Sequence, residues 1–163
     1  ADSRTPEVIE ACFREMHDEY DSHWADETVP YDGIRELLET LIRRGFQLSV
    51  LSNKPHEFTE LMVSRYFPDI CFQRIYGAGG GLPRKPDPAG ALRIADETGI
   101  SAEQYLYLGD TGVDMQTAVA AGMFPIGALW GFRDEAELRE GGARLLLAHP
   151  AGLTHRSGIL SED

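Results

Sequence analysis

The chain has 163 residues and a formal net charge of -12. This length suffices for one domain with a core, because a chain of about 150 residues buries roughly 70% of its unfolded surface. The acidic balance argues against nucleic acid and anionic membranes as partners, and no apolar run is long enough to predict a membrane-spanning helix. Cys12 and Cys71 lack the spacing of a disulfide framework or a zinc site, which predicts a reducing, cytoplasmic compartment.

The apolar pattern predicts one N-terminal helix followed by alternating strands and helices. The first helix begins at Thr5 and Pro6 and repeats apolar residues at helical spacing as far as Trp24, so we expect one of its faces to be buried. The stretch 26–30 breaks this pattern as a linker. We expect further helices ending near residues 44, 67, 99 and 122, a short helix at 134–140, and strands at 46–51, 75–76, 105–108, 125–129 and 145–147. This alternation predicts an α/β fold with a doubly wound, Rossmann-like parallel sheet.

The stretch 105–122 carries the strongest local signal. Residues 105–108 are apolar or aromatic without polar alternation, which is typical of a strand buried on both faces of a parallel sheet. Asp110 follows at the carboxyl end of that strand, where open α/β sheets hold their ligands, and Asp114 comes four residues later as a helix begins. Two carboxylates at the same end of the predicted sheet suit Mg²⁺. The alternative is that both aspartates only cap the helix.

Two further segments offer groups that could bind phosphate. Ser52 and Asn53 follow the strand 46–51, and their hydroxyl and amide groups could grip phosphate oxygens, although they could equally form a capped turn. Lys85 is one of only two lysines among 15 basic residues, and Pro86 and Pro88 restrict its backbone, so its ammonium could face a developing negative charge. The alternative for Lys85 is a solvated position in a loop.

The glycine run 77–81 resembles a dinucleotide-binding loop only superficially. That fingerprint opens a helix directly after the first strand of its unit, whereas prolines and Lys85 separate this run from the next helix. The five histidines show no metal-ligand spacing. We therefore expect neither a nicotinamide cofactor nor a zinc ion.

The motifs taken in order resemble those of the haloacid dehalogenase-like hydrolases. Ser-Asn-Lys at 52–54, Arg-Lys-Pro-Asp-Pro at 84–88 and Leu-Gly-Asp-Thr-Gly-Val-Asp at 108–114 are similar to the second, third and fourth motifs of that family. Ala-Leu-Trp-Gly-Phe at 128–132 and Tyr-Phe at 66–67 look most like its phosphoglycolate phosphatase branch. The resemblance implies that residues 1–28 are the C-terminal part of a helical cap and that residues 29–163 are the hydrolase core.

The same resemblance implies a role for each site residue. Ser52 and Asn53 would bind the transferring phosphoryl group, Lys85 would neutralise it and orient the nucleophile, and Asp110 would hold Mg²⁺ with support from Asp114. The implied reaction is hydrolysis of a small phosphorylated metabolite through an aspartyl-phosphate intermediate.

One family motif has no match in the chain. The apolar strand ending in Asp-x-Asp-Gly-Thr, which carries the nucleophilic aspartate, is absent, and Asp32-Gly33 does not replace it because no buried strand precedes it. In the family this strand lies between the strands expected at 46–51 and 105–108, so we expect a slot there. We expect the chain to be a fragment whose 163 residues alone have no phosphatase activity. The alternatives are a non-catalytic phosphate-binding or partner-binding module and a sugar phosphomutase.

Overall fold

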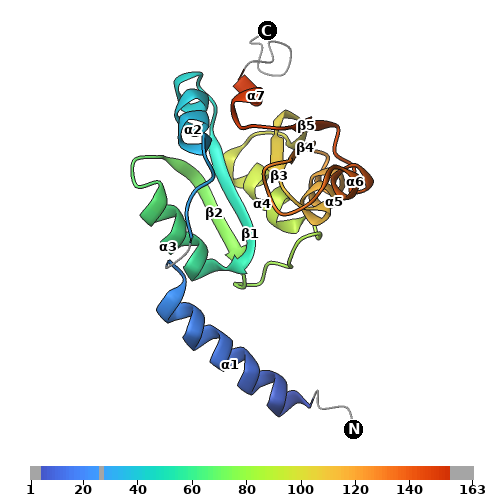
Figure 1. Ribbon diagram of the computed structural model, residues 1–163. Coiled ribbons are helices and arrows are strands. Elements are labelled where there is room, and N and C mark those ends of the chain that lie inside the picture. The colour runs from blue at the N-terminus through green and yellow to red at the C-terminus, as the bar shows by residue number, and fades with distance from the viewer. Residues whose placement is uncertain (1–4, 26–27, 155–163) are drawn as a thin grey trace.

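The computed structural model describes residues 5–25 and 28–154, and it has the predicted α/β architecture with parallel strands (Figure 1). The helices are α1 (Pro6–His23), α2 (Ile34–Arg43), α3 (His56–Tyr66), α4 (Ala89–Thr98), the 3₁₀ turn η1 (Ala102–Gln104), α5 (Gly112–Ala121), α6 (Glu135–Glu140) and α7 (Ala151–Thr154). The strands are β1 (Leu48–Pro55), β2 (Phe72–Ala78), β3 (Leu106–Gly109), β4 (Phe124–Ala128) and β5 (Leu145–Leu147).

The strands form two parallel sheets. One has the order β1-β2 and the other the order β3-β4-β5, and no ladder joins β1 to β3 within the described residues. In the first sheet Val50 pairs with Ile75, and in the second Leu108 pairs with Ile126. Figure 1 shows β1 and β3 as the facing edges of the two sheets. The carboxyl ends of β1 and β3 therefore lead into neighbouring loops.

A cavity of about 700 Å³ lies between these two sheets. Side chains of both facing strands line it, among them Leu48 and Val50 from β1 and Leu106 and Leu108 from β3. It occupies the position where the resemblance predicts a slot. The cavity also corrects one expectation, because all four residues of β3 are only half-buried instead of fully buried.

Two apolar clusters cover the opposite faces of the strands. On one face the buried residues come from α2, β4, β5 and α7, and Leu106 and Leu108 pack against them. On the other face the buried residues are the small side chains of α4 and α5 together with Met123, and Tyr105 and Tyr107 pack against them. Successive residues near β3 thus alternate between the two clusters, as strand geometry requires.

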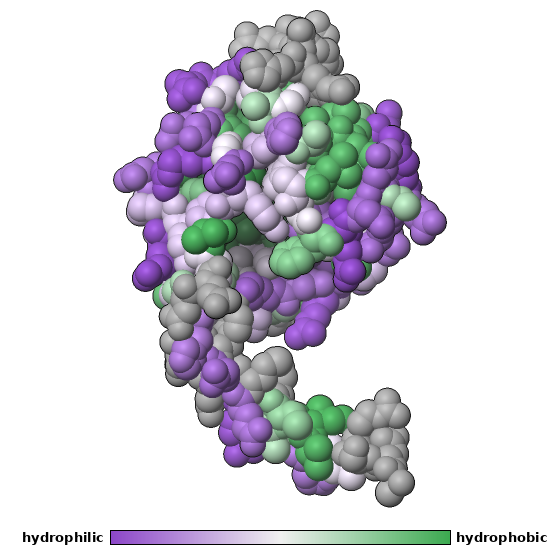
Figure 2. All heavy atoms as spheres, viewed as in Figure 1, coloured by the Kyte–Doolittle hydropathy of each residue, from purple (hydrophilic) through white to green (hydrophobic). Residues whose placement is uncertain are grey.

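Helix α1 extends away from the rest of the molecule (Figure 1). The expectation of a buried apolar face is wrong for its first turns, since Val8 and Ile9 are 46% and 56% exposed, and Figure 2 shows apolar residues on the outer surface of this helix. For Phe13, Met16 and Tyr20 the structure describes the helical backbone but not the side chains. The assignment of residues 1–28 to a cap remains a prediction. None of the described helices has the length and apolarity needed to cross a membrane.

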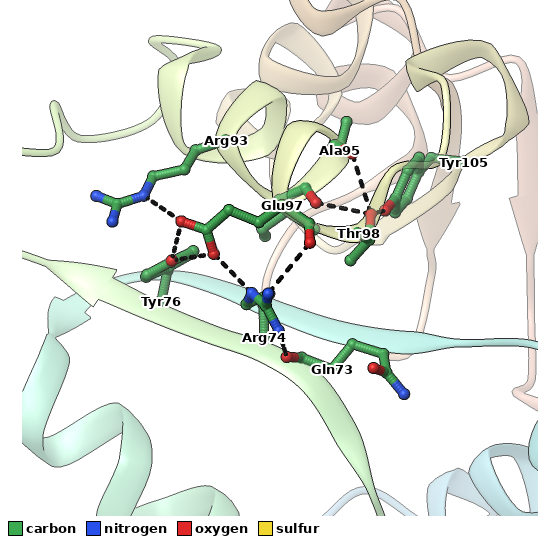
Figure 3. A network of polar contacts seen from close by, with 9 residues as sticks. Gln73, Arg74, Tyr76, Arg93, Ala95, Glu97, Thr98 and Tyr105 are labelled. Atoms are coloured by element: carbon green, nitrogen blue, oxygen red, sulfur yellow. Dashed lines mark hydrogen bonds and ion pairs between the residues drawn. The ribbon is translucent and has the colours of Figure 1, made fainter.

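A polar network joins α4 to the edge strand β2 (Figure 3). The carboxylate of Glu97 accepts hydrogen bonds from Arg93 Nε at 2.8 Å, from the Tyr76 hydroxyl at 2.7 and 2.8 Å and from Arg74 Nε at 2.6 Å. These bonds, in that order of importance, lower the pKa of Glu97 from 4.5 to about 2. The lowered pKa means that folding favours the charged form of Glu97.

We therefore expect Glu97 to contribute stability above pH 4.5 and to lose that contribution as the pH falls towards 2. Glu97→Gln should lower the free energy of unfolding at pH 7, and the difference from the wild type should shrink as the pH falls through this window. Urea unfolding between pH 2.5 and 7 measures both curves. Glu103→Gln, at an exposed position, serves as the control, and parallel pH curves for wild type and Glu97→Gln would contradict the expectation.

Candidate active site

Lys85 lies at the centre of the site, where it links strand β1 to helix α5. Its ammonium donates to the carbonyl oxygen of Leu51 in β1 at 3.2 Å and to Asp114 Oδ1 in α5 at 2.6 Å. The side chains of Lys85 and Asp114 are only 13% and 8% exposed. Lys85 is therefore a partly buried, hydrogen-bonded residue and not a solvated loop lysine, while its role towards a phosphoryl group stays a prediction.

Asn53 holds the backbone of Lys85 in place. Its Nδ2 donates to the Lys85 carbonyl oxygen at 3.0 Å, and its Oδ1 accepts from the Lys85 amide at 2.7 Å. The neighbouring Ser52 hydroxyl accepts from the Lys54 amide at 3.1 Å, which is the capped turn considered above. The carboxyl-terminal half of β1 thus orients the lysine, and burial lowers the pKa of the adjacent Lys54.

The structure separates the roles of the two aspartates. Asp114 is buried and forms a capping box with Thr111, whose amide and hydroxyl donate to Asp114 Oδ2 at 3.1 and 2.7 Å. The capping alternative therefore holds for Asp114, which binds Lys85 through its other oxygen. Asp110 is half-buried, and its Oδ2 accepts from the Phe132 amide at 3.1 Å.

Two glycines allow these close approaches. A Cβ on Gly109 would lie 2.3 Å from the Cβ of Asp114, and one on Gly131 would lie 2.2 Å from the Cβ of Asp110. Real Cβ atoms do not approach side chains this closely, so each aspartate requires a glycine beside it. The glycine of the 130–132 loop in particular lets the Phe132 amide reach Asp110.

The structure brings the predicted site residues to one end of the strands. Asn53, Lys85 and Asp114 form a continuous chain of hydrogen bonds, Ser52 adjoins Asn53, and Asp110 adjoins the capping box. Sequence reasoning missed Thr111, although Thr-x-x-Asp is a recognisable capping pattern. It also missed the Phe132 amide, which binds Asp110, and Glu137, which binds the Gly112 amide. No local pattern predicts contacts between residues 22 to 25 positions apart in the chain.

The carboxylates at this site suit Mg²⁺, which keeps water and substrate ligands, better than a metal ion that is coordinated by protein side chains alone. Among the described residues no group of three or more His, Cys, Asp or Glu side chains could hold an ion. Mg²⁺ commonly uses one or two carboxylates and completes its shell with water and substrate phosphate oxygens. Asp110 has such a carboxylate, with no hydrogen bond to Oδ1 among the described residues, while both oxygens of Asp114 are already bonded.

Tyr107 adds a polar group to the wall of the cavity. Its hydroxyl is buried and has no hydrogen-bond partner among the described residues. Burial, and then the nearby charge of Asp114, raise the pKa of Tyr107. The hydroxyl therefore stays protonated and neutral beside the lysine–aspartate pair.

A family model described as haloacid dehalogenase-like hydrolase matches residues 2–128 of the chain. The chain belongs to this family. Among curated relatives of this haloacid dehalogenase-like hydrolase, a phosphoglycolate phosphatase of Pseudomonas putida is 35% identical over 106 residues, covering 64% of the chain and 39% of the relative. One of Xanthomonas campestris pv. campestris is 31% identical over 128 residues, covering 76% and 56%. The chain thus spans about two fifths to just over half of these relatives.

Solved structures agree with this assignment. A proposed phosphoglycolate phosphatase from Lactobacillus delbrueckii subsp. bulgaricus superimposes with a TM-score of 0.88 and 30% identity, over 99% of the chain and 66% of that structure. A proposed β-phosphoglucomutase from Thermotoga maritima gives a TM-score of 0.76 at 20% identity, over 90% and 68%, which shows the fold alone. The predicted family, its phosphoglycolate phosphatase-like branch and the Rossmann-like fold are confirmed.

Proposed function

We propose that this haloacid dehalogenase-like hydrolase provides the core of a Mg²⁺-dependent phosphatase for a small phosphorylated metabolite, similar to the phosphoglycolate phosphatases among its relatives. The observation that carries the proposal is the position of the Lys85 ammonium between Leu51 and Asp114, at the carboxyl end of the cavity-lining strands. An ammonium has three N–H groups, and these two contacts use two of them. The third is available, within the described residues, for a phosphate or carboxylate oxygen.

The nucleophile in this proposal is a carboxylate on a strand that occupies the cavity between β1 and β3. The apolar side chains of both facing strands would pack against such a strand, and their free edges would pair with its backbone. A carboxylate at its carboxyl end would then lie near Lys85. No carboxylate other than Asp114 contacts Lys85 among the described residues.

The reaction would proceed in two balanced steps. The carboxylate oxygen would bond to phosphorus while the bond between phosphorus and the ester oxygen breaks, and the ester oxygen would take a proton from solvent water and leave as the alcohol. Water then bonds to phosphorus, releases inorganic phosphate and restores the carboxylate. Lys85 would stabilise the phosphoryl charge, with the Ser52 hydroxyl as a further donor and Asn53 holding the lysine in position. Mg²⁺, held by Asp110 with support from Asp114, would supply charge neutralisation at the phosphoryl oxygens.

The test compares the 163-residue chain with the complete product of its gene on a panel of phosphate monoesters, with and without Mg²⁺. We expect turnover only where a carboxylate-bearing strand fills the cavity, and we expect EDTA to abolish it. Asp110→Asn should lower kcat/KM by about 100-fold. Asp96→Asn removes the same charge from an exposed position of α4 and serves as the control.

The alternative of a non-catalytic phosphate-binding module has one observation in its favour. The side chains of Asn53 and Asp114 are engaged in hydrogen bonds with Lys85 and Thr111, as expected of structural residues. Phosphate binding without turnover in every form of the protein would favour that module over the phosphatase. Turnover that is unaffected by EDTA would instead reject the role assigned to Asp110.

A further inference from the structure

The segment from Gly131 to Glu137 contacts residues 110–112, which lead into α5 and include its first residue, at two points. The Phe132 amide donates to Asp110 Oδ2 at 3.1 Å, and Glu137 Oε1 accepts from the Gly112 amide at 3.0 Å. Asp110 and Gly112 flank Thr111, so the two contacts fix both ends of one short loop. This loop carries the carboxylate to which the proposed function assigns the cation.

The second contact depends on close packing between α5 and α6. Gly112 is buried, and a Cβ there would lie 3.2 Å from the Cγ of Glu137. A Cβ on Gly141 would lie 2.8 Å from the Cα of Gly112. Two glycines thus bring α6 against the first turn of α5, where the Glu137 carboxylate meets a backbone amide that has no partner within its own helix.

Glu137 is itself held in place from two directions. Its backbone amide donates to Asp134 Oδ1 at 2.9 Å, and its Oε2 lies 3.5 Å from Arg133 Nε. Its side chain is 42% exposed, so the ion pair with Arg133 is not a strong source of stability. The feature that distinguishes Glu137 from the other acidic residues of α6 is its bond to the buried Gly112 amide.

We propose that Glu137 is a positioning residue that sets the affinity of Asp110 for Mg²⁺, an inference that rests on the proposed function. The Phe132 amide occupies Oδ2 of Asp110, and the bond from Gly112 to Glu137 fixes the peptide beyond it. Oδ1 of Asp110 is thereby presented in a fixed direction. Partners that orient a metal ligand from outside its first coordination shell change metal affinity by about 10- to 100-fold when they are removed.

Isothermal titration with MgCl₂ on the 163-residue chain tests this inference. Glu137→Met keeps the length of the side chain and removes the acceptor, and we expect it to weaken Mg²⁺ binding about 10-fold. Glu137→Gln keeps an amide oxygen that can accept from Gly112, and it should bind Mg²⁺ nearly as the wild type does. Glu140→Ala, which removes an exposed charge from the same helix, should leave binding unchanged.

A second measurement does not depend on the metal. Amide hydrogen exchange at Gly112 should accelerate in Glu137→Met and remain slow in Glu137→Gln. If Glu137→Met does not fold, Glu137→Asp replaces it in the test. This variant shortens the side chain by one methylene, and we expect the same loss of Mg²⁺ affinity and faster amide exchange at Gly112.

The outcomes separate this inference from the proposed function. A wild-type chain that binds no Mg²⁺ overturns the metal role of Asp110 and, with it, the role of Glu137. A wild-type chain that binds Mg²⁺, with equal affinity in Glu137→Met, overturns the Glu137 inference alone. A lower melting temperature with unchanged affinity would show that Glu137 only stabilises the packing of α5 against α6. An equal loss in Glu140→Ala would assign the effect to net charge.

Discussion

Replacing Lys85 with methionine should lower the free energy of unfolding by about 3 kcal/mol. The substitution keeps the length of the side chain but leaves the Asp114 carboxylate, which is 8% exposed, without its cationic partner. A buried charge that loses its partner retains its full desolvation penalty. Urea unfolding at pH 7 measures the loss of stability.

A double-mutant cycle identifies the source of this loss. Asp114→Asn keeps an oxygen for Thr111 but removes the charge that Lys85 binds. If the ion pair is the cause, the double variant should lose clearly less than the sum of the two single losses, with a coupling energy above about 1 kcal/mol. Additive losses would contradict the expectation and would place the effect of Lys85→Met in packing alone.

The second large effect is expected from Gly109→Ala. The new Cβ would lie 2.3 Å from the Cβ of Asp114, 2.6 Å from its Cγ and 2.9 Å from its Oδ2. Asp114 cannot move away without breaking its bonds to Lys85 and Thr111, so overpacking should cost about 3 kcal/mol. The variant should also give a lower melting temperature, because the end of β3 and the start of α5 must separate.

Gly152→Ala provides a matched comparison. Its Cβ would lie 3.3 Å from a methyl group of Leu147, a side-chain end that can shift by a few tenths of an ångström. Gly152 lies in α7, where alanine is intrinsically favoured over glycine. We expect this variant to be within about 1 kcal/mol of the wild type. A Gly109→Ala protein as stable as Gly152→Ala would show that the Asp114 side chain is not fixed as described.

Periodicity and turn residues predicted the element types well, because they are local properties. Each predicted strand is present, although β1 runs on to Pro55 and β2 begins at Phe72, earlier than expected. These extensions follow from pairing between the two strands, in which Leu48 pairs with Phe72 and Pro55 with Ala78. Such boundaries depend on a partner strand and cannot be deduced from either segment alone.

The residues of the candidate site could be proposed from the sequence, but the contacts between them could not. Position after a predicted strand indicates Ser52, Asn53 and Asp110, and the family resemblance adds roles for Lys85 and Asp114. The structure shows that Asn53 binds a backbone 32 residues away and that Asp114 both caps a helix and binds Lys85. The spacing of Asp110 and Asp114 in the sequence supports helix capping and metal binding equally. Only the folded geometry could therefore distinguish the role of Asp114 from that of Asp110.

The space between β1 and β3 also has a thermal consequence. Its walls are mainly hydrocarbon, and covering hydrocarbon lowers the heat capacity of the system. Any segment that fills this space should therefore bind with an enthalpy that becomes more negative as the temperature rises. The heat-capacity change on unfolding should also be larger for the filled protein than for the unfilled one. Calorimetry could then report on occupancy of this space without reference to any enzymatic assay.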